Sequence, residues 1–288
     1  LLEALVPLLL RGINMLYGDS VDSIPSSSTV ARFAMKWFPL TLYWAFGASM
    51  SNESRKQLDA MLIQYVASEV PPDAALADLT VDESGEWLPW TSCIPRMEIE
   101  PHQVVDTGVV ITTSDTLRHT EVLKGWLDSH KPLVLCGPPG SGKSMTLSTV
   151  IEGMSDYILT ILNFSSSTEP SLILKTFTQY CEVFEGIDGL IMQPDRKLYS
   201  ENKWLVVFCD EINLPEMDKY GTQRVITFMR QLTEQGGYWN SNCKWVSLKR
   251  IQFVGACNPP TDVGRVTLSN RFLRHATIMF VDYPNEIS

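Results

Sequence analysis

The sequence lacks several patterns that would assign it to a special class of protein. Its six cysteines form no C-x-x-C pair and have no ligand spacing typical of a zinc site. Cys136, Cys209 and Cys257 lie in apolar runs, so we interpret them as reduced core residues of an intracellular protein. No block rich in Lys and Arg occurs, and the formal net charge is −10. We therefore expect no partner among nucleic acids and no anionic membrane surface.

Long apolar runs and a signal-peptide layout are also missing. The stretch from Trp37 to Asn52 is shorter than the roughly 20 residues that a membrane-spanning helix needs, and it contains Pro39. We interpret it as part of a buried helix. The chain begins inside an apolar run without Met, which favours a piece cut from a longer protein. Its 288 residues suffice for about two domains.

The clearest motif is a phosphate-binding loop between an apolar strand and a helix candidate. Gly137 to Ser144 reads G-P-P-G-S-G-K-S, which has the G-x-x-x-x-G-K-S spacing. Glycines let backbone N–H groups approach a phosphate, and the helix that follows presents its positive end to the anion. We expect Lys143 to reach the β- and γ-phosphates and Ser144 to bind Mg²⁺. The expected nucleotide-binding residues are Gly137, Pro138, Pro139, Gly140, Ser141, Gly142, Lys143, Ser144 and Met145.

Two carboxylates end a second apolar strand. Asp210 and Glu211 follow the run Trp204–Cys209. In an enzyme with a phosphate-binding loop, Asp210 would hold Mg²⁺ and Glu211 would polarise the attacking water. A Glu at this place favours an ATPase with its own base over a GTPase that uses Gln. The alternative interpretation is that Asp210 and Glu211 are ordinary acidic residues at the end of a strand.

Asn258 ends the next apolar run, directly before two prolines. Asn before Pro-Pro is by itself a turn signal. Because the chain also contains the two motifs above, we favour a role for Asn258 in orienting the attacking water against the γ-phosphate. Glu211, Asn258 and Lys143 are thus the predicted catalytic residues.

Arg271 and Arg274 precede the last expected strand and share one face of a helix candidate. Taken alone, they could form a solvated basic face. The functional interpretation is a pair of arginine fingers offered to the nucleotide of a neighbouring module.

The sequence pattern of the first part of the chain predicts helices. Residues 1–70 would form a helical subdomain: residues 1–16 bent or broken near Pro7, residues 29–46 apolar nearly all round, and a third helix capped by Ser51 or Asn52. The third helix carries one apolar stripe at helical spacing: Leu58, Met61, Leu62, Tyr65 and Val66. We expect residues 71–108 to form a β-leaning connector that contains short strands at 87–90 and 97–100. A further domain would cover residues 109–288.

In that domain, strand and helix patterns alternate. The expected strands are 133–136, 158–164, 204–209, 251–257 and 278–281. The expected helices are 114–129, 143–153, 171–184, 222–235 and 268–275. Strands that are apolar on both faces predict an α/β fold with a five-stranded parallel sheet covered on each side. Residues 186–202 and 236–250 predict two β-hairpin inserts.

Together these motifs resemble the AAA+ ATPases. They supply a Walker A motif at Gly137–Ser144, a Walker B motif at Val206–Glu211, a sensor 1 residue at Asn258, and fingers at Arg271 and Arg274. From about residue 85 onward the chain resembles the cytoplasmic dynein heavy chain family more specifically, best in its third AAA module. The segments that carry this resemblance are Asn163–Ser166, Cys209–Pro215, Asp218–Gln223, Gly255–Asp262 and Arg271–His275. Residues 1–70 match more loosely and would be the helical lid of the previous module.

The resemblance implies a P-loop AAA+ large subdomain that binds and hydrolyses ATP with Mg²⁺. It would be one of six modules in a single-chain ring and would regulate a minus-end-directed microtubule motor in the cytoplasm. Neighbouring modules would be direct partners, whereas the microtubule and accessory chains would bind other parts. Its own lid is expected after Ser288. The isolated fragment would hydrolyse ATP poorly, because the arginine finger for its site comes from the next module.

Two departures from the family pattern are small. Ser144 stands where Thr is usual, and both residues offer a hydroxyl to Mg²⁺, while Val263 replaces a Pro. Two alternatives remain open: a nucleotide-binding structural ring module without turnover, and a stand-alone AAA+ remodeller of protein or DNA outside the dynein family.

Overall fold

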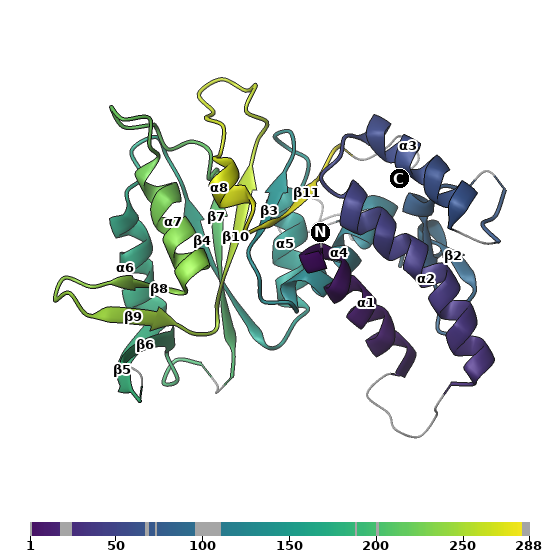
Figure 1. Cartoon of the computed structure of the whole chain (residues 1–288), viewed down its shortest axis with the longest axis horizontal. Coiled ribbons are helices and arrows are strands. Elements are labelled where there is room, and N and C mark those ends of the chain that lie inside the picture. Colours follow the sequence, from purple (N-terminus) through teal and green to yellow (C-terminus); the bar gives the residue numbers. More distant parts are fainter. Residues whose placement is uncertain are drawn as a thin grey trace, which may run out of the picture. The chain divides into compact units, whose positions relative to one another are not determined.

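The computed structural model describes residues 2–17, 25–66, 69–72, 74–95, 111–187, 189–199 and 202–283. The chain forms two compact units (Figure 1). The first comprises Leu1–Ser129 with Asp282–Ser288, and the second comprises His130–Val281. Strand pieces expected at 97–100 and the domain start expected near residue 109 lie outside the described residues. Among the described helices, none combines the length and apolar character needed to cross a bilayer.

The first unit is mainly helical. Its α-helices are α1 (Leu2–Tyr17), α2 (Ser27–Gly47), α3 (Asn52–Tyr65) and α4 (Ser114–Leu127). Two short 3₁₀ helices, η1 (Leu76–Asp78) and η2 (Trp90–Cys93), flank the antiparallel strands β1 (Leu79–Val81) and β2 (Trp87–Pro89). Hydroxyl caps begin three of the helices, since Ser26, Ser51 and Thr113 each accept a hydrogen bond from the backbone N–H three residues on.

The structure corrects two details of the helical prediction. Helix α1 continues through Pro7, so of the expected bend or break, the break does not occur. Proline has no backbone N–H to donate within the helix. On α3, Leu62 is buried, but Met61 and Tyr65 of the expected apolar stripe are 59% and 74% exposed. The second buried position is Arg55, which donates to the Gly47 and Ala48 carbonyls at 2.8 and 2.7 Å and so caps the end of α2.

Helix α2 is also less enclosed than its composition suggests, since Met35, Phe38 and Phe46 are exposed. A small helical unit cannot cover one helix on all sides.

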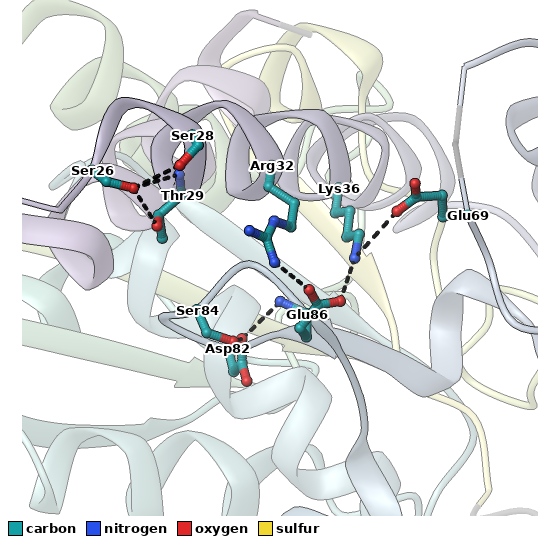
Figure 2. A network of polar contacts seen from close by, with 9 residues as sticks. All are labelled: Ser26, Ser28, Thr29, Arg32, Lys36, Glu69, Asp82, Ser84 and Glu86. Atoms are coloured by element: carbon teal, nitrogen blue, oxygen red, sulfur yellow. Dashed lines mark hydrogen bonds and ion pairs between the residues drawn. The ribbon is translucent and has the colours of Figure 1, made fainter.

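A polar network ties α2 to the turn between β1 and β2 (Figure 2). The Lys36 side chain is only 3% exposed, and its Nζ donates to Glu86 Oε2 at 2.8 Å. Arg32 donates to the other Glu86 oxygen at 2.6 Å. Glu86 is itself held by its backbone N–H, which donates to Asp82 Oδ1 at 2.8 Å. The bonds from Lys36 and, second, from Arg32 hold the pKa of Glu86 below its usual range. The network therefore fixes the hairpin against α2.

The second unit contains the predicted five-stranded parallel sheet. Its strands are β3 (Leu133–Cys136), β4 (Tyr157–Asn163), β7 (Trp204–Asp210), β10 (Ile251–Cys257) and β11 (Thr277–Phe280), in the order β11-β3-β10-β7-β4. The helices are α5 (Lys143–Glu152), α6 (Pro170–Tyr180), α7 (Arg224–Gln235) and the short α8 (Asn270–Leu273). Helices α6 and α7 pack on one face of the sheet, and α5 lies on the other (Figure 1).

Parallel register brings the carboxyl ends of the strands to one edge. Cys136 of β3 pairs with Cys257 of β10, and Asn163 of β4 pairs with Asp210 of β7. Residues 205–209 of β7 are fully buried because layers of helices cover both faces of the sheet. Loops that carry polar groups therefore converge at this edge.

The second unit also contains a four-stranded sheet, of which the sequence predicted only the two hairpins. Strands β5 (Cys181–Gly186), β6 (Gly189–Pro194), β8 (Gly237–Trp239) and β9 (Trp245–Leu248) join in the order β5-β6-β9-β8. The hairpin expected at 236–250 is confirmed. The helix expected to reach Phe184 instead ends at Tyr180, because residues from Cys181 onward pair with β6. The first hairpin therefore begins earlier than predicted.

Candidate functional site

The phosphate-binding loop lies between β3 and α5, in the context that its motif requires. Gly140 and Gly142 have φ values of 78° and 82°, a region that favours glycine. Gly137 is required for a different reason, since a Cβ there would clash with the Val281 carbonyl oxygen. Gly142 caps α5, so the loop ends where backbone N–H groups point outward from the helix. The first turn of α5 includes the half-exposed Met145.

Lys143 connects the loop to the neighbouring strand end. Its Nζ donates to the Gly137 and Pro138 carbonyl oxygens, both at 2.8 Å, and to Asn258 Oδ1 at 3.1 Å. The side chain is buried, and this burial lowers the pKa of Lys143, while the Asp210 carboxylate opposes the change. The ammonium group therefore lies beneath the loop, within reach of Asn258.

Ser144 and Asp210 form a pair of oxygen ligands. The Ser144 hydroxyl donates to Asp210 Oδ2 at 3.0 Å, and the backbone N–H of Glu211 donates to Asp210 Oδ1 at 2.9 Å. Mg²⁺ is usually held by one or two protein oxygens together with water and phosphate oxygens. No group of three or more His, Cys, Asp or Glu suited to a metal occurs among the described residues. The chemistry of this pair fits Mg²⁺ bound together with a nucleotide.

Asn258 lies between Lys143 and Glu211. Its side chain is buried; it accepts from Lys143 and donates from Nδ2 to Glu211 Oε1 at 3.4 Å. Its backbone oxygen accepts a bond from Asn213 Nδ2 at 2.8 Å. Glu211 itself has φ of 60°, which is uncommon for a residue with a side chain. The structure thus brings Lys143, Asn258 and Glu211 into one chain of contacts.

Arg265 is a member of this cluster that the sequence reasoning missed. Its guanidinium forms an ion pair with Glu211 Oε2, and its side chain is 14% exposed. A lone Arg after Gly264 carries no motif, so no local signal could have identified it. The two residues are 54 positions apart in the chain.

The two cysteines at the ends of β3 and β10 also lie beside the loop. Cys136 directly precedes Gly137, and Cys257 directly precedes Asn258. A hydrogen bond from Cys257, helped by the Lys143 charge, lowers the pKa of Cys136 despite burial. The same bond, burial and the Cys136 charge raise the pKa of Cys257.

Arg271 and Arg274 do not join this cluster. Arg271 is exposed on α8, and Arg274 donates to Glu234 Oε1 of α7 at 3.0 Å. Neither forms a hydrogen bond or ion pair with a described residue of the phosphate-binding loop. The predicted helix 268–275 is shorter than expected, and Arg274 is its C-cap.

A glycine-rich loop between a parallel strand and a helix, ending in Lys-Ser, defines the class of P-loop nucleotide-binding domains. Residues 98–284 match the family described as "P-loop containing dynein motor region", and residues 2–92 match the "Dynein heavy chain AAA lid domain". The chain belongs to the dynein heavy chain family. Its helical N-terminal part is therefore an AAA lid domain, and the parallel sheet belongs to the P-loop motor region.

Individual relatives agree with this family. The chain is 47% identical over 271 residues to the cytoplasmic dynein heavy chain of Caenorhabditis elegans, covering 93% of this chain and 6% of that protein. The corresponding protein of Drosophila melanogaster is 47% identical over 266 residues, covering 91% and 6%. That of Dictyostelium discoideum is 48% identical over 252 residues, covering 86% and 5%. The chain thus spans about one-seventeenth of the length of these relatives.

The domain limits given by the family matches differ from those of the compact units. The two family matches meet between residues 92 and 98, whereas the compact units divide after Ser129. The division into 1–70, 71–108 and 109–288 stays a prediction.

Proposed function

We propose that this chain is an ATP-binding and ATP-hydrolysing module of a cytoplasmic dynein heavy chain, equivalent to the third AAA module. One observation carries the proposal. Two adjoining contact sets, Ser144 with Asp210 and Lys143 with Asn258 and Glu211, lie at the carboxyl ends of neighbouring strands. This is where a P-loop enzyme binds phosphates, a metal ion and a water molecule.

Each group has a distinct chemical task in the proposed reaction. The loop N–H groups and Lys143 bind the β- and γ-phosphates of ATP, and Lys143 stabilises the charge that develops there. Ser144 and Asp210 would hold Mg²⁺, which would neutralise phosphate charge when bound. Glu211 accepts a proton from the water that attacks the γ-phosphorus, so that ADP and phosphate leave. Asn258 orients this water and holds Glu211 beside it.

The proposal extends to the whole protein through its family. The first unit would be the lid of the preceding module, and Arg271 and Arg274 would face the nucleotide of a neighbouring module. The complete protein would act in the cytoplasm as a microtubule motor. The microtubule and accessory chains would bind parts of it beyond this chain.

Glu211→Gln tests the enzymatic claim. In a complete heavy chain carrying this sequence, with turnover at the other modules disabled, we expect ATP to stay bound while hydrolysis falls at least about 100-fold, because the general base is lost. Single-turnover hydrolysis and nucleotide retention are measured together. Glu216→Gln is the matched control, since Glu216 is an exposed carboxylate nearby. Tight ATP binding without turnover in the unaltered module would instead support a structural nucleotide-binding role.

A further inference from the structure

The carboxylate of Glu211 has few contacts to fix its direction. Its backbone lies in the left-handed region, and the Asn258 amide donates to Oε1 over a long 3.4 Å. Arg265 forms an ion pair with the other oxygen, Oε2. Arginine is always charged and strongly directional, so this pair constrains the carboxylate more than the amide does.

Arg265 is itself held by the backbone around the site. Its N–H donates to the Asp262 carbonyl at 3.2 Å, and the N–H of the next residue, Val266, donates to the Asn213 carbonyl at 2.9 Å. Asn213 in turn donates from its side chain to the Asn258 carbonyl at 2.8 Å. The segment that carries Arg265 is therefore bonded to Asn213, which lies two positions from Glu211. Through Asn213 it is linked to Asn258, which directly follows β10.

We propose that Arg265 is a positioning residue that orients the Glu211 carboxylate toward the attacking water. The inference rests on the proposed ATP hydrolysis. With Asn258 on Oε1 and Arg265 on Oε2, both oxygens are fixed, yet each retains a lone pair for a water proton. The cluster then forms one chain of contacts, which runs from Lys143 through Asn258 and Glu211 to Arg265. Arg265 acts through Glu211, and it forms no hydrogen bond or ion pair with Ser144 or Asp210 in the part of the chain that the structure describes.

Substitution of Arg265 in the complete heavy chain, with turnover at the other modules disabled, tests this role. We expect Arg265→Gln to lower kcat about 10- to 100-fold, because a displaced Glu211 carboxylate accepts the proton of the attacking water with poor geometry. The Kd and KM for ATP should stay unchanged. Arg265→Lys retains a charge and should recover part of the loss. Combined with Glu211→Gln, either change should cause no further loss.

Arg224→Gln is the matched control. Arg224 is 70% exposed and lies 3.7 Å from Asp218, so its loss should leave turnover and ATP affinity unchanged.

The outcomes separate this inference from the proposed function. If Glu211→Gln leaves turnover unchanged, the proposed function itself fails. If Glu211→Gln stops turnover but Arg265→Gln does not slow it, only the positioning role fails. Weaker ATP binding or a lower Tm in both Arg265 variants would show a structural role and would also overturn the inference.

Discussion

At the scale of single residues, the cysteine pair beside the phosphate-binding loop has unusual chemistry. Cys136 and Cys257 are in-register partners on adjacent parallel strands, and neither forms a disulfide. Their shared hydrogen bond and the nearby Lys143 lower the pKa of Cys136. Burial raises the pKa of Cys181 to about 12. We therefore expect a larger thiolate fraction at Cys136 than at Cys181 at neutral pH.

We expect Cys136 to be alkylated by iodoacetamide much faster than Cys181, since the thiolate is the nucleophile. The rate at Cys136 should rise with pH and level off at a lower pH than the rate at Cys181. Cys257→Ala removes the hydrogen bond and should slow the reaction about tenfold at neutral pH. Mass spectrometry of the Cys136 peptide follows the reaction, and Cys181→Ala is the control. Equal rates in the parent and Cys257→Ala proteins would contradict this prediction.

At the scale of elements, α4 packs a buried histidine against α2. His119 is 5% exposed, and its ring lies 6.0 Å from that of Trp44 in an edge-on arrangement. Its Nε2 is buried and has no hydrogen-bond partner among the described residues. Burial, with smaller contributions from the charges of Arg118 and Arg55, lowers the pKa of His119 to about 3. The contact between these helices therefore requires a neutral imidazole.

The stability of the first unit should consequently fall in acid. An unfolded His takes up a proton below about pH 6.5, whereas the folded His119 stays neutral down to about pH 3. Between these values stability decreases as pH falls, by about 1.4 kcal/mol per pH unit, and above pH 6.5 the contribution is constant. Denaturant unfolding followed by tryptophan fluorescence from about pH 7 to about pH 5 measures this slope.

His119→Phe keeps an aromatic ring beside Trp44 and should reduce the slope. His275→Phe is the control, because His275 is partly exposed and lies in the second unit. Equal pH slopes for the parent and His119→Phe proteins would show that His119 is not responsible.

At the scale of the whole molecule, the second unit carries arginines that its own site does not use. Arg274 is paired with Glu234, whereas Arg271 is exposed and has no ion pair among the described residues. In the proposed ring, an exposed arginine can reach the nucleotide of another module. Arg271 is then the better candidate for an arginine finger.

Arg271→Ala in a complete heavy chain should lower turnover at the neighbouring module about 1,000-fold, because an arginine finger stabilises the transition-state charge. ATP binding and turnover at this module's own site should not change. Arg274→Ala should have the smaller effect, since Arg274 already pairs with Glu234. Module-specific turnover, with the remaining modules disabled, provides the measurement. Loss of turnover at the module's own site would contradict this assignment.

Local sequence was sufficient for several parts of the fold. The limits of β3 and β10 agree with their predicted ranges because short runs that are apolar on both faces fit only a covered parallel strand. The cap of α4 at Thr113 likewise depends on residues three positions apart. The phosphate-binding loop follows from glycine conformations and from spacing within eight residues.

Pairing and packing partners decided what the local sequence pattern could not. Residues from Cys181 have a helical pattern, yet they form β5 because β6 supplies backbone partners. The stripe on α3 stays largely exposed, since apolar periodicity does not reveal which neighbours a helix meets.

The sequence by itself therefore determined the class of this protein, its sheet and the residues of its phosphate-binding loop, because these depend on short-range spacing. Only the tertiary structure joined Arg265 to Glu211 and Cys136 to Cys257. These contacts link residues far apart in the chain, and only the register of parallel strands and the path of the loops between them bring such residues together.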